Sequence, residues 1–235
     1  MKLILHRGIS TSEIDAEETV RFIKDRGFSG KEGIWNFNIP NIAVVREKLE
    51  TIFLAEHPTK DDIFGDTPFG GICACGDKIG ACYYALKHNR SQEKPIAILI
   101  TFEASIDDVY IDPRDFLCSA FQFWDRETTS LKDKQASILK DVYGNGVLRY
   151  FERCTSTSNQ QTRITMCNLA SFDTRVIEDH YLNKKIIGGR YGVMFCSAFF
   201  VKTPVVVSAI KHCEIISGEH KELDLYVDVY KFDKL

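Results

Sequence analysis

The sequence contains no long hydrophobic run. No apolar stretch approaches the roughly 18 residues that a membrane-spanning helix needs. The apolar stretch near the start, Leu3–Leu5, is too short for the core of a signal peptide. We therefore expect a protein without membrane contact that works in the cytoplasm, either its own or that of a target cell. Secretion as a toxin or injection into another cell would leave no readable mark in these residues.

The sequence also has no large excess of either charge and no common nucleotide-binding motif. It carries 30 Lys and Arg against 33 Asp and Glu in 235 residues, for a formal net charge of −3. This balance argues against a protein that coats duplex nucleic acid, although a local basic groove is still compatible with it. The phosphate-loop glycine pattern and the dinucleotide pattern G-x-G-x-x-G are both missing. Their absence counts against a nucleotide kinase and against a Rossmann dehydrogenase.

Cysteine is too sparse for a fold that depends on disulfides. Eight cysteines are spread over the chain, and several lie inside apolar stretches. Examples are Cys118, Cys167, Cys196 and Cys213. We expect most of them to be reduced and buried as small hydrophobic residues of a cytosolic protein.

The remaining composition and patterning indicate one α+β domain over residues 1–235. A hydrophobic content of 44% with 27% charged residues is typical of a globular chain with a sizeable core. No internal repeat, low-complexity tract or linker divides it. Alternation or continuous apolarity predicts strands over 2–6, 95–103, 190–201, 204–216 and 221–232, with an extended segment over 109–117. Helical periodicity and end signals predict helices over 11–27, 41–57, 79–88 and 130–144, with a loop between 57 and 71.

Two short stretches combine residues that suit a phosphate-containing ligand. In "LHRGIS", Arg7 leaves a strand end directly before Gly8, where an arginine can hold a phosphate through two hydrogen bonds. In "FGGICACGDKIGACYYAL", Gly70 and Gly71 accompany a strand, and a following helix carries Tyr83 and Tyr84. Glycines allow a ligand to approach the main chain closely. Strand alternation lets only one of His6 and Arg7 face a cleft, and the position next to Gly8 favours Arg7.

These stretches resemble the ADP-ribosyltransferase superfamily, which includes bacterial toxins and poly-ADP-ribose polymerases. "HRG" is similar to the family's Arg or His before a glycine on the first strand, and "GICACGDKIGACYYA" is similar to its later strand, turn and helix. The resemblance implies two small packed antiparallel or mixed sheets with flanking helices and an NAD-binding cleft between them. It also implies transfer of ADP-ribose from NAD to a protein or nucleic acid, through an oxocarbenium-like transition state stabilised electrostatically. A neutralising or host partner protein is a further expectation for such a toxin or effector.

The resemblance assigns roles to particular residues. Arg7 would hold the NAD phosphate or ribose, and one of three candidate carboxylates would orient the ribose. The candidate acids are Asp112, Glu219 and Glu222, and the residues expected to line the cofactor are His6, Arg7, Gly8, Gly71, Ile72, Cys73, Tyr83 and Tyr84.

The chain also departs from the family pattern, which keeps other interpretations open. Cys73-Ala74-Cys75 stands where the Arg branch has Ser-Thr-Ser, and Cys73 stands where the His branch has a tyrosine. A Ser-Thr-Ser does occur at Ser156–Ser158, but without an evident helix after it. An inactive domain that recognises a partner is therefore the main alternative. A thiol hydrolase using Cys75 and a zinc site at Cys73, Cys75, Cys82 and His88 are further ones. In a purely structural interpretation, Arg7 forms a salt bridge and the two tyrosines belong to the core.

Overall fold

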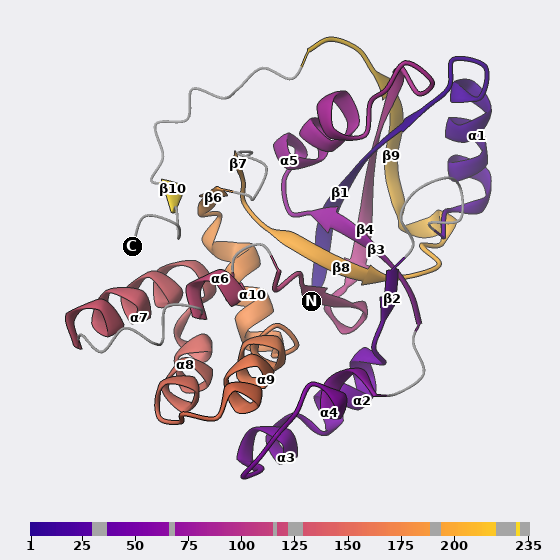
Figure 1. The fold of residues 1–235 in the computed structure, drawn as a ribbon. Helices are drawn as coiled ribbons and strands as arrows, with labels where there is room; N and C mark the ends of the chain where they lie inside the picture. The colour runs from indigo at the N-terminus through magenta and orange to yellow at the C-terminus, as the bar shows by residue number, and fades with distance from the viewer. Residues whose placement is uncertain are drawn as a thin grey trace.

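The first strand, β1 (Lys2–Thr11), lies inside the main sheet, between β3 and β4. Leu3, Leu5 and Ile9 alternate onto one face and are at most 3% exposed. The structure, a computed structural model, describes residues 1–29, 37–65, 69–114, 117–121, 129–188, 194–219 and 229–230. In these residues the chain is α+β, with a mostly antiparallel sheet and flanking helices (Figure 1). The expected fold class is confirmed at this level.

The main sheet has the strand order β5-β8-β3-β1-β4-β9, and β2 pairs with β3 outside this path. Its other strands are β2 (Phe37–Ile39), β3 (Phe69–Cys75), β4 (Ile96–Ser105), β5 (Val109–Ile111), β8 (Ala198–Lys202) and β9 (Ile210–Ile216). A small second sheet contains β6 (Ile186–Gly188), β7 (Met194–Phe195) and β10 (Val229–Tyr230). Only the pairing of β10 with β6 is parallel among the described strands. Most of the last expected strand, 221–232, lies outside the described residues.

The main sheet consists of two halves that meet beside β1. On one side, β1 pairs with β4 from Lys2 to Thr11. On the other side, β1 and β3 are paired at one position, where His6 lies opposite Cys75. Figure 1 shows β3 and β8 running across the direction of β1, β4 and β9. Side chains between the two halves can therefore reach from one strand to the other.

Helices cover both faces of the sheet and form a separate group beside β5. The helices are α1 (Ala16–Arg26), α2 (Ile42–Glu47), α3 (Leu49–Leu54), α4 (Asp61–Phe64), α5 (Lys78–Tyr83), α6 (Leu117–Phe121), α7 (Thr129–Tyr143), α8 (Leu148–Thr155), α9 (Gln160–Ala170) and α10 (Thr174–Asn183). A π-helical turn over Tyr84–His88 continues α5. Helix α1 packs against β9 and β4, whereas α5 packs against β1. Helices α6 to α10 gather below and to the left of the sheet in Figure 1, and α10 contacts β5.

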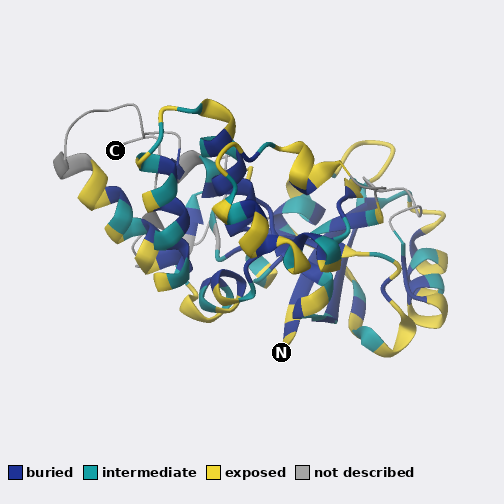
Figure 2. Cartoon of the chain, turned by 90° about the horizontal axis from the view of Figure 1, so that it is seen from below, coloured by how far each residue is buried: buried dark blue, intermediate teal, exposed yellow. Residues whose placement is uncertain are grey.

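Buried residues are concentrated in the sheet and on the inner faces of these helices (Figure 2). A second, smaller apolar cluster lies between α5 and the sheet. It contains Cys75, Ala81 and Leu99, each at most 4% exposed. Within the described ranges, no helix has the length and apolarity required to cross a lipid bilayer.

Several sequence predictions need correction at the level of single elements. Helix α1 ends at Gly27 as expected, but it begins at Ala16, with Asp15 as its N-cap, instead of near residue 11. The Ser12 hydroxyl instead donates to the Asp15 carboxylate. The helix expected over 41–57 is divided at Lys48, and the loop expected before β3 contains α4. Helix α9 begins soon after Ser156–Ser158, so these residues form a polar connection between two helices.

The cysteine prediction is wrong for one pair. Cys118 and Cys167 form a disulfide, with their Cα atoms 5.6 Å apart. Cys196 and Cys213 are free thiols, as expected. The pairing depends on α6 lying against α9, a tertiary contact that sequence spacing does not reveal.

Candidate functional site

Arg7 is a buried cation at the junction of the two sheet halves. It lies opposite Ile100 of β4, on the same face of β1 as Leu5 and Ile9, and is 6% exposed. Its Nη1 donates to the carbonyl oxygen of Cys73 on β3. Burial lowers the pKa of the guanidinium, and the nearby thiols of Cys73 and Cys75 oppose that shift. Since the ordinary pKa of arginine is above 12, the group is still a cation at neutral pH.

No carboxylate of the described residues forms an ion pair with Arg7. A buried charge without an opposite charge is costly, and most buried arginines in proteins are paired. The expectation of a surface salt bridge at Arg7 therefore does not describe this position. An anion that enters the junction would provide the missing partner.

A second arginine reaches Cys73 from the other side. Arg114 follows β5, and its Nη2 lies 3.6 Å from the Cys73 sulfur. Burial raises the pKa of the Cys73 thiol to about 12, with the Asp112 charge adding to the shift and Arg114 opposing it. The thiol is therefore neutral at physiological pH. The neutral Cys73 thiol therefore does not compensate the positive charge of Arg7 or of Arg114.

Asp112 holds Arg114 in place through a two-pronged ion pair. Arg114 Nε donates to Oδ1 at 2.8 Å, and Nη2 donates to Oδ2 at 2.6 Å. The Arg114 amide also donates to Oδ1, at 3.1 Å, so the turn is closed by both backbone and side chain. The rings of Phe200 and Phe37 lie 4.8 and 5.2 Å from the Arg114 guanidinium carbon. These contacts fix a partly exposed cation beside the buried one.

We name the group of Arg7, Cys73, Asp112 and Arg114 the two-arginine cluster. It contains two positive charges and one carboxylate, so the described side chains leave an excess of one positive charge. Guanidinium groups bind phosphate oxygens through paired hydrogen bonds. The cluster is therefore suited to a phosphate or diphosphate.

Gly8 does not leave space for a ligand. A Cβ atom built on Gly8 would lie 1.8 Å from the carbonyl oxygen of Ala81, so α5 contacts the main chain of β1 directly. The amide of Asn89 donates to the Gly8 carbonyl at 3.1 Å and secures the same contact. Gly71 serves a similar purpose, because a Cβ there would lie 2.6 Å from Cγ2 of Ile39. Both glycines permit close packing within the protein, in contrast to the predicted approach of NAD.

Two other predicted cofactor residues face away from the two-arginine cluster. Ile72 is fully buried in the core of the inner strand β3, so it cannot line a binding surface. His6 points to the opposite face of β1, where its Nδ1 lies 2.9 Å from the Thr101 hydroxyl. Burial and the neighbouring Lys78 charge lower the pKa of His6 to about 4, so its imidazole is neutral.

The tyrosine pair belongs mainly to the protein's own packing. Tyr83 is 7% exposed and joins the main core, with His88 stacked at a ring separation of 6.2 Å and the Lys87 amine 5.8 Å from its ring. Tyr84 is half-buried and meets Tyr83 edge to face at 5.6 Å. Tyr84 is thus the member of the pair with an accessible surface.

Of the three candidate acids, Asp112 is the one that belongs to the two-arginine cluster, through its ion pair with Arg114. Glu219 is exposed beyond the end of β9. Through β4, the β9 residue in line with Arg7 is Cys213, and the strand runs about 10 Å further to Ile216 before Glu219 is reached. Glu219 therefore lies away from the two-arginine cluster. Glu222 lies outside the described residues.

Sequence reasoning missed Arg114 and the rings around it as parts of one site. The pairing of Asp112 with Arg114 inside "DPRDF" is the expected local one. Arg114 contacts Cys73 only because β8 pairs with both β3, which carries Cys73, and β5, which precedes Arg114. Nothing in the sequence of the "DPRDF" segment predicts that Cys73 is its neighbour.

The structure does not favour metal or thiol chemistry at the β3–α5 junction. Among the described residues, no group of three or more His, Cys, Asp and Glu side chains could hold a metal ion. Cys75 is 4% exposed and packs against Ala81 and Leu99, so its thiol is not accessible to a substrate. His6 lies opposite it on β1.

Comparisons of this chain with protein-family models, with curated proteins and with solved structures find no match.

Proposed function

We propose that the protein is an NAD-dependent mono-ADP-ribosyltransferase of toxin or effector type, which modifies a protein or nucleic-acid acceptor. The observation that carries the proposal is the buried Arg7 guanidinium, which pairs with no carboxylate of the described residues and, like Arg114, contacts Cys73 at the junction of β1 and β3. The two guanidinium groups can donate to the oxygens of the NAD diphosphate, and the excess of one positive charge offsets part of its two negative charges.

In this proposal, each residue of the two-arginine cluster has a distinct task. Arg7 binds the diphosphate from the buried side, and Arg114 binds it from the accessible side. Tyr84 follows α5, which packs on the face of β1 that Gly8 presents, opposite to the face of Arg7, so this proposal gives it no role at the nicotinamide. The bond between nicotinamide and the ribose C1′ breaks, nicotinamide leaves with the bonding electrons, and the acceptor's nucleophile forms the new bond to C1′ and loses its proton. Asp112 is the acid nearest to the ribose in this arrangement.

The compartment that fits this chemistry is a cytoplasm, either the protein's own or that of a target cell, because NAD and macromolecular acceptors are both available there. A neutralising or host partner protein belongs to the same proposal. The competing function is a domain that has kept the site but lost the chemistry and recognises a partner. Cys73 in place of a hydroxyl or tyrosine, and the distance of Glu219 from Arg7, favour that competitor.

The test is release of nicotinamide from NAD by the purified protein, followed by mass spectrometry of a lysate for added ADP-ribose. We expect Arg7→Ala to lower NAD turnover by roughly tenfold or more, equivalent to at least about 1.4 kcal/mol of transition-state stabilisation. Arg7→Lys keeps the charge but loses the planar fork, so it should also be impaired.

The matched control is Arg175→Lys. Arg175 is paired with Asp173 in the helical group, outside the two-arginine cluster, and should leave turnover unchanged. Circular dichroism of each variant reports whether the fold persists. Binding of ADP-ribose without cleavage of NAD would identify the inactive recognition domain instead. Equal turnover of folded Arg7→Ala and wild type would remove Arg7 from the mechanism.

A further inference from the structure

Phe69 presents an aromatic ring at the accessible start of β3. It is the first residue of the strand and is 37% exposed. The exposed Lys202 ends the neighbouring strand β8, and its Nζ lies 5.1 Å from the centre of the Phe69 ring. An exposed ring and a cation therefore lie together on one face of the sheet.

A second ring lies further along the same face. Phe37 of β2 and Lys202 of β8 are both paired with Gly71, one on each side of β3. Directly paired residues and alternate residues of a strand point to one face of a sheet, so Phe37 and Lys202 lie on the face that carries Phe69. The half-buried Phe37 ring is 5.2 Å from the guanidinium carbon of Arg114. The face thus continues from the exposed Phe69 to the two-arginine cluster.

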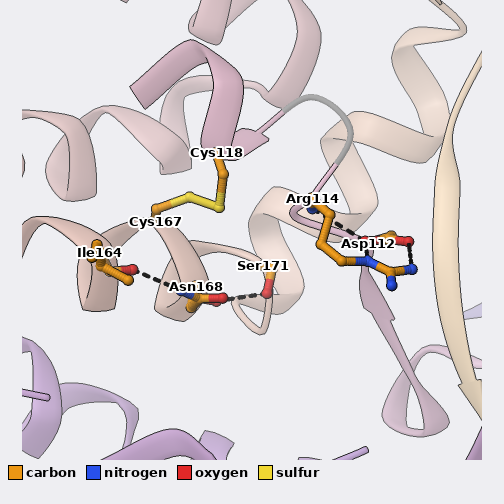
Figure 3. The surroundings of a disulfide bond; sticks show 7 residues. All are labelled: Asp112, Arg114, Cys118, Ile164, Cys167, Asn168 and Ser171. Atoms are coloured by element: carbon orange, nitrogen blue, oxygen red, sulfur yellow. Dashed lines mark hydrogen bonds and ion pairs between the residues drawn. A yellow bond between two sulfur atoms is a disulfide. The ribbon is translucent and has the colours of Figure 1, made fainter. Parts of the chain in front are cut away.

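Four residues on this face form a row of alternating cations and rings. We name this row the ring–cation strip, and it consists of Arg114, Phe37, Lys202 and Phe69. Arg114 is shared with the two-arginine cluster, and Figure 3 shows its ion pair with Asp112 at this end of the strip. Lys202 forms no ion pair with a carboxylate of the described residues. With Arg7, the strip and the cluster contain three positive charges against one carboxylate.

The strip is longer than a site for one nucleotide needs to be. Phe69 and Cys73 are four residues apart on β3, which corresponds to about 13 Å along the strand. The alternation of rings and cations matches a polymer in which planar bases alternate with phosphates. Proteins that bind single-stranded nucleic acids combine aromatic rings for stacking with positive charges for the backbone. The bases of a duplex are stacked inside it and do not reach such rings.

A peptide matches the strip less well. Peptides that dock on a sheet add a strand to an exposed edge and gain main-chain hydrogen bonds there. Both edges of β3 are already paired, with β8 on one side and with β2 and β1 on the other. The groups that the strip offers are therefore side chains, which suit bases and phosphates.

We propose that the ring–cation strip binds single-stranded nucleic acid, and that this polymer is the acceptor of the ADP-ribose. The use of the strand as acceptor rests on the proposed function, whereas its binding does not. Bases stack on Phe69 and Phe37, and the flexible Lys202 amine moves from the Phe69 ring to a phosphate. In the transfer, a base nitrogen forms the bond to the ribose C1′ and loses its proton to water, while nicotinamide leaves with the electrons of the broken bond.

The experiment measures binding of a fluorescent DNA dodecamer to the full chain by anisotropy, with the dodecamer as a single strand and as a duplex. We expect the single strand to bind at least about tenfold more tightly than the duplex. Phe69→Ala should weaken single-strand binding by roughly tenfold, because one stacked base is lost, and should leave its salt dependence unchanged. Lys202→Ala should weaken binding by roughly threefold to tenfold. It should also lower the slope of log affinity against log salt concentration by about 0.7, because one phosphate contact is lost.

The matched controls are Phe64→Ala and Lys87→Ala. Phe64 of α4 has a ring of similar exposure, 41%. Lys87, in the π-helical turn after α5, is an exposed lysine whose amine lies 5.8 Å from the Tyr83 ring. Both control variants should bind the single strand as wild type does. Circular dichroism reports whether each variant is folded.

The proposal is overturned if the single strand does not bind, if the duplex binds as tightly, or if Phe69→Ala and Phe64→Ala have equal effects. ADP-ribose found only on proteins, in a lysate that also contains nucleic acids, overturns the assignment of the acceptor. Failure of the proposed function looks different: NAD is never cleaved, while the single strand still binds and Phe69→Ala and Lys202→Ala still weaken its binding.

Discussion

The contact between Gly8 and α5 permits a direct test of how the helix after β3 packs against β1. Substitution Gly8→Ala places a Cβ atom 1.8 Å from the Ala81 carbonyl oxygen. An ordinary contact needs about 3.4 Å, so α5 must move away from β1 by roughly 1.5 Å. The obstacle is backbone, which cannot rotate aside as a flexible side chain can.

The cost follows from what the movement disrupts. The hydrogen bonds of Asn89 to Gly8 and of Ser10 to Asn89 both join β1 to the end of the π-helical turn, and each contributes about 1 kcal/mol. Overpacking of a close contact adds roughly 1–3 kcal/mol. We expect Gly8→Ala to lower the free energy of unfolding by about 3–5 kcal/mol, and the melting temperature by about 6–20 °C for a domain of this size.

Gly146→Ala is the matched control. A Cβ at Gly146 would lie 3.4 Å from its nearest neighbour, a methyl group of Val176, so the substitution should change stability by less than about 1 kcal/mol. The assay is urea unfolding followed by circular dichroism, with thermal melting in parallel. If Gly8→Ala and Gly146→Ala had the same free energy of unfolding, α5 could not pack closely against β1 at Gly8. The packing of α5 on the main chain of β1 at Gly8 would then be refuted.

Two further predictions concern buried ionisable groups. His180 is fully buried, and burial lowers its pKa to about 4. Between pH 6.5 and pH 4 the unfolded chain takes up a proton that the native state does not, so stability falls as pH is lowered through this range. We expect this histidine to account for a loss of about 2–3 kcal/mol between pH 7 and pH 4.5, and urea titrations of His180→Leu should show a pH dependence smaller by that amount. An unchanged pH dependence would contradict the buried neutral imidazole. Asp112→Asn removes the partner of Arg114 and should lower unfolding stability by about 2 kcal/mol, whereas the exposed Asp107→Asn should have almost no effect in the same assay. Equal effects of the two substitutions would show that Asp112 does not anchor the turn.

Local patterning in the sequence was sufficient for much of the fold. The alternation in "KLILH" predicted β1, and the apolar run over 95–103 predicted β4, because period-2 burial follows from strand geometry itself. Gly27 ended α1, and Gly144 ended α7, each with positive φ. A left-handed position after a helix selects glycine through a local steric preference. Such signals need no knowledge of distant residues.

The composition of the candidate site depended on contacts that no local pattern encodes. Arg7 was identifiable from its place before Gly8, but its neighbour Arg114 comes from a segment more than a hundred residues later in the chain. Only the pairing of β8 with both β3 and β5 brings Arg114 to Cys73. The function of Gly8 also depends on a distant contact: it allows α5 to pack directly on the main chain of β1, whereas the sequence predicted that a ligand would approach there.

The sequence by itself determined the general α+β class, strands such as β1 and β4, helices such as α1 and α7, and the presence of a basic residue at the first strand, but it did not predict α8, α9 or α10. Those features follow from propensities and periodicities that act over a few residues. The tertiary structure decided which charges are paired, which glycines face protein, and which cysteines are joined. Cys118 and Cys167 become a pair because α6 lies on α9, and Arg7 has no carboxylate partner among the described residues because the sheet halves meet beside it. Charge pairing and covalent pairing depend on distances in space, which the order of residues along a chain does not fix.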